Sequence, residues 1–399
     1  MSGEIRIHAP SVDVHGGVQR IRFRVEGLQS PELWFDVRTA QEGLVAQTCD
    51  PAVVTLLAAA MDAGKNLVVQ GPMSARLHWS IHNTVIPVVQ RQLPFLQPIR
   101  VVAEGGRERA EPGGAGVLMG FSCGVDAFSA LRDHFLGPDI DEEDRITHLV
   151  FCHLGHSGYG RGAPHRAEER WSRAARAAER LGLPLLRVDS NGPDFYPREY
   201  DSRLNWMATL TLRFSAVPLL LQAGMRRFLC SSSHSWEDLR IGPTYDMTIG
   251  EPVLLPALGT ERVDLVSVGA EYTRVEKTKA IGGIPLAQDF LDVCIMVGDD
   301  VNCSRCEKCL RTILTLELLG RLDGFSRRFD MGEYRKHRTD FIARVLAERT
   351  SPYHLEIREL LRGQNSPVPL SARLKAALLR VWRLVPHDLR RRLRGLPRP

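Results

Sequence analysis

Residues 117–128 read VLMGFSCGVDAF, and this stretch decides the fold. An apolar run ends at Phe121, the next three residues read SCG, and apolar side chains then recur at helical spacing. This pattern predicts a buried strand, a tight turn and the start of a helix. Such a turn aims backbone N–H groups and a helix N-terminus at one point, where an anion can bind. We expect either a phosphate-binding turn or a plain strand-to-helix turn of an α/β protein.

Apolar runs alternate with amphipathic segments downstream of this stretch. Strands are predicted at 117–121, 148–154, 185–189 and 227–231, helices at 166–181 and 204–222, and either a fifth strand or a helix start at 265–268. The alternation predicts an α/β fold with a doubly wound parallel sheet. Ligands bind such sheets beyond the carboxyl ends of the strands, where the strand order reverses. We therefore expect one pocket bordered by residues 122–127, 153–159, 189–191 and 231–240.

The sequence suggests four regions. Residues 1–103 are predicted to form an N-terminal β-rich domain, with an alternating strand at 21–25 and one helix at 51–63. Residues 104–115 are polar and rich in Gly and Pro, as linkers are. We expect the domain boundary there, followed by a core at 116–322 and a helical C-terminal region with a basic tail at 323–399.

Half of the eight cysteines are concentrated in one segment, as Cys294, Cys303, Cys306 and Cys309. The spacing C-x8-C-x2-C-x2-C predicts a closed, structural Zn²⁺ site of four thiolates, with metal-free core cysteines as the alternative. Basic side chains at 305, 308 and 311 would offset its negative charge. A cluster of this kind indicates a reducing compartment, so we expect a cytoplasmic protein. Neither a run of about 18 apolar residues nor a basic-then-apolar leader is present, which predicts no membrane span and no secretion.

The basic charge of the chain resides in its tail. The chain has 52 Lys and Arg residues and 47 acidic residues. Residues 366–399 contain nine of the basic residues and one of the acidic residues, so the tail carries +8. The remaining 43 bases and 46 acids carry −3. Apolar side chains at helical spacing over 374–385, with basic ones between them, predict an amphipathic helix. RNA, an anionic membrane surface or an acidic protein would bind it, whereas docking on its own domain is the alternative.

Two motifs together resemble a known family. Residues 122–127 resemble a variant of the S-G-G-x-D-S loop of the PP-loop ATP pyrophosphatases. The four-cysteine spacing is similar to the zinc motif of one branch, the 7-cyano-7-deazaguanine synthases of the queuosine pathway. Residues 158–161, with His165 and Glu168, resemble the segment that this family carries after its second strand. The resemblance covers roughly residues 115–320.

This resemblance implies a HUP/PP-loop-like core and an ATP-dependent C–N ligase. The cofactor-binding residues would be Ser122, Cys123, Gly124, Val125, Asp126, Ala127, Cys152 and His153, and the substrate-binding residues would be Ser232, Ser233, His234 and Asp238. Ser122 and Asp126 would be catalytic, with Asp126 organising Mg²⁺ beside the phosphates of ATP. A small-molecule carboxylate would become an acyl-adenylate, ammonia would convert it to an amide, and a second activation would give a nitrile. A second copy of the chain is also among the expected partners.

Two positions depart from the family loop. Cys123 replaces its first glycine, which suits a positive φ, and Ala127 replaces its closing serine. The missing hydroxyl removes a hydrogen bond to a charged group, typically about 1.5–3 kcal/mol. These departures leave a non-catalytic nucleotide-binding homologue with a degenerate loop as one alternative. The basic tail leaves a second, a tRNA- or nucleobase-modifying PP-loop enzyme that holds RNA with this tail. His153, His156 and His165 are further acid–base candidates, and Cys123 is either a reactive thiolate or a small buried side chain.

Overall fold

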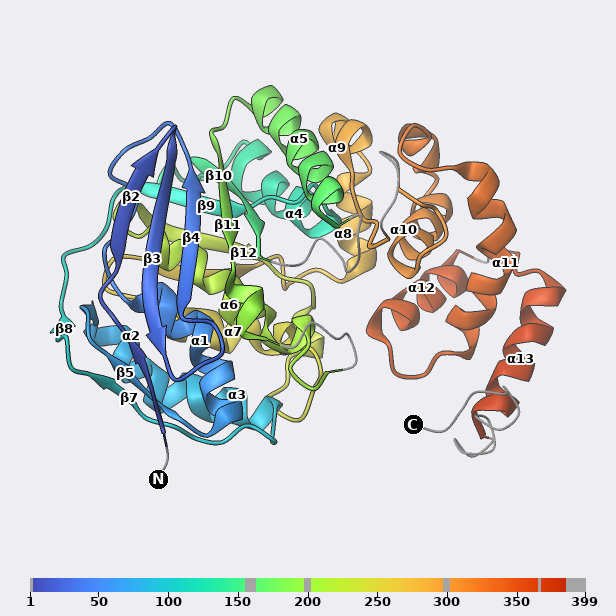
Figure 1. The fold of residues 1–399 in the computed structure, drawn as a ribbon. Helices are drawn as coiled ribbons and strands as arrows, with labels where there is room; N and C mark the ends of the chain where they lie inside the picture. Colours follow the sequence, from blue (N-terminus) through green and yellow to red (C-terminus); the bar gives the residue numbers. More distant parts are fainter. Residues whose placement is uncertain (1–2, 155–162, 197–201, 297–301, 365–366, 385–399) are drawn as a thin grey trace. The chain divides into compact units, whose positions relative to one another are not determined.

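The computed structural model describes residues 3–154, 163–196, 202–296, 302–364 and 367–384. The chain forms two compact units, Met1–Tyr272 and Thr273–Pro399. The first unit is built around one large sheet, and the second unit is helical where it is described (Figure 1).

The predicted parallel strands lie at one end of the sheet of the first unit. They are β9 (Gly116–Gly120), β10 (His148–His153), β11 (Leu185–Ser190), β12 (Met225–Ser231) and β13 (Asp264–Val268). They pair in the order β13-β12-β9-β10-β11, and each pair is parallel. The predicted α/β class with a mainly parallel sheet is confirmed. Residues 264–268, for which strand and helix were both considered, form a strand.

Helices cover both faces of these strands (Figure 1). They are α4 (Val125–Leu131), α5 (Ala163–Leu181), α6 (Trp206–Leu220) and α7 (Glu251–Ala257), with the short segments η2 (Arg132–Leu136), η3 (Gly192–Phe195), η4 (Trp236–Asp238) and η5 (Met247–Gly250). Alternate side chains of β10 show the two faces. Phe151 packs on Trp171 of α5, with ring centroids 5.8 Å apart, whereas Val150 and Cys152 belong to the hydrophobic core that includes α1 and α6. A strand buried on both faces reads as a continuous apolar run.

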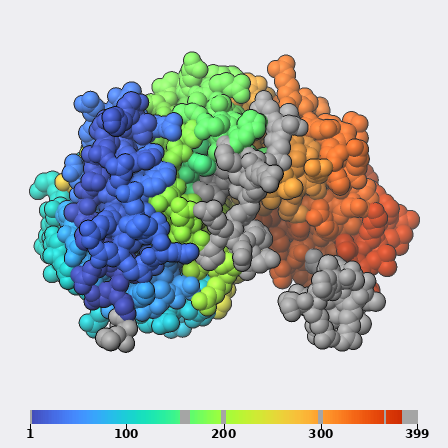
Figure 2. Space-filling view, in the orientation of Figure 1, coloured from blue at the N-terminus to red at the C-terminus, as the bar shows by residue number. Residues whose placement is uncertain are grey.

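The N-terminal region continues the same sheet. Its strands are β1 (Glu4–Ile7), β2 (Ser11–His15), β3 (Val18–Glu26), β4 (Glu32–Arg38), β5 (Asn66–Val69) and β7 (Val101–Ala103), and its helices are α1 (Asp50–Ala63), α2 (Ala75–Ser80), η1 (Ile81–Val85) and α3 (Ile86–Gln92). β4 pairs antiparallel with β11, which joins the β-rich region to the parallel strands. In the space-filling view, blue N-terminal residues lie directly against green residues from the middle of the chain (Figure 2). One core is therefore shared, and α1 packs on α6 within it.

Residues 104–115, expected as a linker, run inside the first unit. β8 (Arg107–Glu108) pairs with β6 (Met73–Ser74), and the Gly113 N–H donates to Arg262 O over 3.1 Å. A Cβ atom at Gly113 would lie 2.5 Å from Gln222 O, and one at Gly114 would lie 2.4 Å from Gly224 O. Glycine at these two positions allows two backbone segments to approach closely. Close packing therefore accounts for these glycines, which in the sequence indicate a flexible linker.

The second unit consists of helices where it is described. These are α8 (Arg274–Ile281), α9 (Pro285–Phe290), α10 (Glu307–Leu318), η6 (Leu322–Phe325), α11 (Met331–Ala347), α12 (Pro352–Gly363) and α13 (Leu370–Leu384). The four clustered cysteines precede or begin α10, so they belong to this unit and not to the unit with the parallel sheet. In the described part of the chain, helices lack the length and apolar content that crossing a membrane requires.

Candidate functional site

The loop after β9 lies at the carboxyl end of a central strand. The Phe121 N–H donates to Val150 O over 2.9 Å, which continues the pairing with β10 to the first residue of the loop. Ser122 is exposed, and its hydroxyl accepts from the Gly124 N–H over 3.3 Å. Gly124 has extended backbone angles and directly precedes α4. The predicted strand, tight turn and helix start are therefore present at the predicted residues.

Cys123 adopts a conformation that glycine would adopt more easily. Its φ is +58°, in the left-handed region, and its side chain is 1% exposed. A residue with a Cβ atom costs roughly 1–2 kcal/mol in this conformation. Beneath the turn, the rings of Phe121 and Phe128 meet edge to face at 5.6 Å. The loop thus keeps a glycine-like backbone without a glycine. The thiol is buried, which matches the alternative of a small buried side chain.

Cys152 and His153, expected to bind the cofactor, point to opposite faces of β10. Cys152 is buried in the shared core, and burial raises the pKa of its thiol. His153 Nδ1 lies 2.8 Å from Asp189 Oδ1, on the neighbouring strand β11. Burial alone would raise the pKa of Asp189, but hydrogen bonds from His153 and Arg187 outweigh it and lower that pKa. An ionised Asp189 therefore orients the imidazole.

Arg187 links this pair to α5, in a network that the sequence analysis did not single out. Its guanidinium donates to Asp189 Oδ2 over 2.9 Å and, as a fork, to Glu168 over 2.6 and 2.9 Å. It also lies 5.6 Å from the ring centre of Trp171. The sequence does contain a signal for this network: Arg187 and Asp189 are two charged residues, two positions apart, in the otherwise apolar run LLRVDS. Two such residues face the same side of a strand.

The loop after β12 holds the four residues expected to bind the acid substrate. Ser232 is buried, and its hydroxyl donates to His234 O over 2.7 Å. His234 Nε2 lies 3.2 Å from Asp246 Oδ2, and its Nδ1 lies 3.6 Å from Asp238 Oδ2. The Asp238 carboxylate also accepts from the Ser235 N–H over 3.3 Å. Ser232, His234 and Asp238 thus hold the loop together, while Ser233 is half-buried.

Asp246 anchors this loop and was not predicted. Its Oδ1 accepts from the Thr248 N–H over 3.0 Å and from the Thr248 hydroxyl over 2.6 Å. Burial alone would raise the pKa of Asp246, but the hydrogen bonds from His234 and Thr248 outweigh it and lower that pKa. Asp246 lies twelve residues beyond His234, so no local spacing in the sequence signals the contact.

The four predicted metal ligands converge at one point. The sulfur atoms of Cys294, Cys303, Cys306 and Cys309 all lie within 4.8 Å of one another. The Cys306–Cys309 and Cys303–Cys309 sulfur distances are 3.4 and 3.8 Å. A tetrahedral zinc ion with Zn–S bonds of about 2.3 Å requires sulfur–sulfur separations of about 3.8 Å. The cluster could therefore hold a metal ion such as zinc.

The surroundings of the cluster suit thiolates. The Cys306 N–H donates to Cys303 Sγ over 3.3 Å, and Cys306 directly precedes α10, whose N-terminus favours negative charge. Hydrogen bonds from Cys306 and Cys309 lower the pKa of Cys294, whereas the contact with Cys294 and burial raise the pKa values of Cys306 and Cys309. Three basic side chains were expected to offset the charge of the cluster. The Arg305 guanidinium, one of them, also lies 4.0 Å from the carboxylate oxygen Glu333 Oε1.

Asn302 fixes the segment that carries Cys294. Its Oδ1 accepts from the Cys294 N–H over 3.1 Å, and its Nδ2 donates to Leu291 O and Arg328 O, each over 3.0 Å. Ser304, between the second and third cysteines, has a φ of +56° and accepts from the Asp330 N–H over 2.8 Å. These contacts pre-form the turn that brings the thiols together, as residues around metal ligands commonly do.

Several predicted residues contribute differently or lie outside the described part of the chain. Residues 158–161 and His156 lie outside it. His165 is exposed and lies 3.3 Å from Glu169, one helical turn further along α5. Glu168, the other residue of that segment, binds Arg187.

Comparison of the chain with known proteins finds no matching family model, no matching curated protein and no matching solved structure. A functional assignment therefore depends on the geometry of the loops after β9 and β12 and of the four-cysteine cluster.

Replacing Cys306 with Ser should abolish metal binding. Because all four sulfur atoms face one point, removing one leaves an incomplete and more weakly binding site. We expect about one zinc ion per chain in the unmodified protein by atomic emission, and loss of that zinc with a lower midpoint of thermal unfolding in Cys306→Ser. Cys49→Ala, a buried cysteine of the other unit, is the control and should retain the metal. An unmodified protein that takes up no zinc would contradict the assignment.

Replacing Asp246 with Asn should destabilise the first unit in a pH-dependent way. The pKa of Asp246 is lowered on folding, so its contribution is present above the unfolded value of 3.8 and is lost as the pH falls through the folded value. We expect Asp246→Asn to lower the free energy of unfolding by about 1–3 kcal/mol at pH 6, and less towards pH 3.

Urea titrations at both pH values measure this difference. Exposed Asp139→Asn is the control and should change the free energy of unfolding little at either pH. A cost for Asp246→Asn that stays constant as the pH falls would show that the charge of Asp246 contributes nothing.

Proposed function

We propose that this chain binds ATP with Mg²⁺ beyond the carboxyl ends of β9 and β12 and uses it to adenylate a small-molecule carboxylate. The observation that carries the proposal is the strand order β13-β12-β9-β10-β11. The sheet grows in opposite directions from β9, so the loops after β9 and β12 leave toward opposite faces, and ligands bind such sheets in the space between two loops of this kind. Residues 122–127 border it on one side, and residues 232–238 border it on the other.

The first loop suits the phosphates of ATP. Ser122 is exposed, Gly124 carries no side chain, and the backbone then enters α4. Asp126 lies in the first turn of that helix, where a carboxylate and phosphate oxygens would share Mg²⁺. His153 and the backbone of Cys152 end the adjacent strand β10, where we place adenine. We place the acid substrate along residues 232–238, the loop in which Ser233 is half-buried.

The reaction that we propose is that of an ATP-dependent C–N ligase of the PP-loop type, similar to the 7-cyano-7-deazaguanine synthases. A substrate carboxylate oxygen attacks the α-phosphorus of ATP, and pyrophosphate leaves. Ammonia then attacks the acyl carbon, AMP leaves, and an amide forms after loss of a proton. The amide oxygen would then attack the α-phosphorus of a second ATP with loss of pyrophosphate and a nitrogen-bound proton, and loss of AMP with the remaining nitrogen-bound proton would give a nitrile. Positioning and charge neutralisation supply the catalysis in such phosphate chemistry. In this proposal Zn²⁺ at the four cysteines is structural, because four thiolates leave it no open position.

Asp126→Asn should weaken ATP binding in the presence of Mg²⁺ at least about tenfold, because the change removes the carboxylate charge and keeps the side-chain size. Isothermal titration calorimetry with ATP and Mg²⁺ measures the effect. Asp139→Asn, on the exposed segment after η2, is the matched control and should bind as the unmodified chain does. An unmodified chain that binds no ATP at all would eliminate this proposal.

A second candidate function is nucleotide binding without turnover. The observation in its favour is the loop itself: Cys123 occupies a left-handed position, and Ala127 is 4% exposed and offers no hydroxyl to a phosphate. Backbone donors alone would then hold the nucleotide in a non-catalytic homologue.

The double variant Cys123→Gly/Ala127→Ser distinguishes the two functions. If the chain is a ligase, the unmodified protein should exchange radioactive pyrophosphate into ATP with at least one member of a panel of small carboxylic acids. If it only binds nucleotide, exchange should be absent in the unmodified chain and should appear in the double variant. Under the second function, Asp126→Ala should leave the already absent exchange unchanged.

A further inference from the structure

Helix α13 presents an apolar row to solvent. Leu370, Leu374, Leu378 and Val381 are 71%, 59%, 69% and 63% exposed. At 100° per residue these four positions fall within an arc of about 80° on one side of the helix. Large aliphatic side chains this exposed are ordinary when isolated, but a continuous row of them marks an interaction surface.

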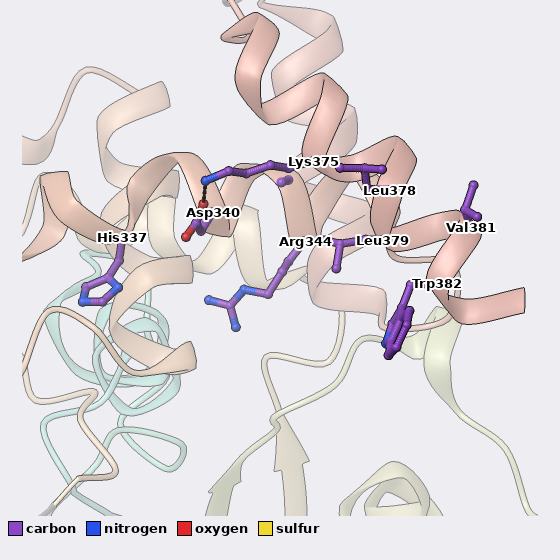
Figure 3. A pocket seen from close by; sticks show the side chains of 9 residues that line it. His337, Asp340, Arg344, Lys375, Leu378, Leu379, Val381 and Trp382 are labelled. Atoms are coloured by element: carbon purple, nitrogen blue, oxygen red, sulfur yellow. Dashed lines mark hydrogen bonds and ion pairs between the residues drawn. The ribbon is translucent and has the colours of Figure 1, made fainter. Parts of the chain in front are cut away.

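The opposite side of α13 holds the helix on its own unit. Ala372 and Ala376 are buried, and α13 packs against α11. Lys375 Nζ is paired with Asp340 of α11, and the Arg380 guanidinium donates to Leu346 O over 2.6 Å. In Figure 3, Lys375 extends toward Asp340, whereas Leu378 and Val381 point away from it. Ala372 and Ala376 therefore face the unit, whereas the four side chains of the apolar row stay exposed, so self-docking does not account for the row.

Cations border the apolar row on both sides. By helical angle, Arg373 and Arg380 lie on one flank, and Lys375 lies on the other flank with Trp382. Arg373 is exposed, and Trp382 is partly exposed and lines, with Leu378 and Val381 of the row, a groove of about 810 Å³ between α11 and α13. Long basic side chains beside an apolar row can keep their charges in water while their stems follow the apolar surface. The following residues, 385–399, contain five arginines and one acid.

We propose that α13 lies on an anionic lipid bilayer, with its leucine and valine row in the boundary between headgroups and acyl chains. A row of exposed aliphatic side chains on one side of a helix fits the plane of a bilayer, and the flanking cations match anionic headgroups. RNA would pair with the cations but would leave the leucines in water. An acidic protein seated in the groove would cover Leu378 and Val381 but would leave Leu370 and Leu374 in water. This surface is independent of the proposed nucleotide site.

Co-sedimentation of the full chain with vesicles tests the proposal. We expect at least about tenfold stronger binding to phosphatidylcholine vesicles containing phosphatidylglycerol than to phosphatidylcholine alone, and weaker binding at high salt. Leu374→Gln/Leu378→Gln should reduce binding to the anionic vesicles at least about tenfold, because two large apolar side chains no longer enter the bilayer. Val14→Gln/Trp79→Gln removes apolar residues of matching exposure, 67% and 63%, from the other unit and should bind normally.

A second pair of changes keeps the test decisive if the leucine variant unfolds. Arg373→Glu/Arg380→Glu preserves the apolar row and should remove the preference for anionic vesicles. Three outcomes would overturn the proposal: no binding of the unmodified chain to anionic vesicles, binding unaffected by either double variant, or a dimer by light scattering that the leucine variant dissociates. Salt-sensitive binding of tRNA without vesicle binding would instead assign the tail to RNA.

Discussion

The parallel pairing of β9 with both β10 and β12 is the constraint on which the first unit depends. A central strand with neighbours on both sides and helices on both faces must be apolar throughout, so its polar residues can begin only where the strand ends. That end is Ser122. Because the crossovers from β9 and from β12 leave on opposite faces, the space between their loops is where we propose the nucleotide site.

Local patterns predicted much of this arrangement. Apolar runs predicted the strands from β9 to β12, and glycine residues predicted the ends of α1 and α5. The cysteine spacing predicted the cluster that could hold a metal ion. Each signal lies within a few residues of the feature that it predicts. The long-range pairings carried no such signal. Nothing near Val37 shows that β4 joins β11, and Gly113 and Gly114 have the same composition whether they belong to a flexible linker or to a close backbone contact.

The polar networks around the candidate nucleotide site were the least predictable part. Asp189 joins His153 to Arg187, and Arg187 in turn binds Glu168, so three elements are linked. Asp246 reaches back to His234 across a loop without regular periodicity. Burial makes these contacts necessary, because a buried charge without partners costs far more than one that is paired. The sequence does not indicate that these Asp and Arg side chains are buried, because most Asp and Arg side chains in folded proteins are exposed.

The conformation of Cys123 separates the shape of the loop from its chemistry. A residue with a Cβ atom is held at a φ of +58° at a cost of roughly 1–2 kcal/mol, and burial of the thiol offsets part of that cost. The surrounding contacts, including the Phe121–Phe128 ring pair and the Ser122–Gly124 hydrogen bond, therefore determine the turn more strongly than the residue within it does. A turn that keeps its shape keeps the direction of its backbone N–H groups, so anion binding can survive the loss of the glycine. The hydroxyl missing at Ala127 has no such backbone substitute. Our two functional proposals therefore differ at position 127 more than at position 123.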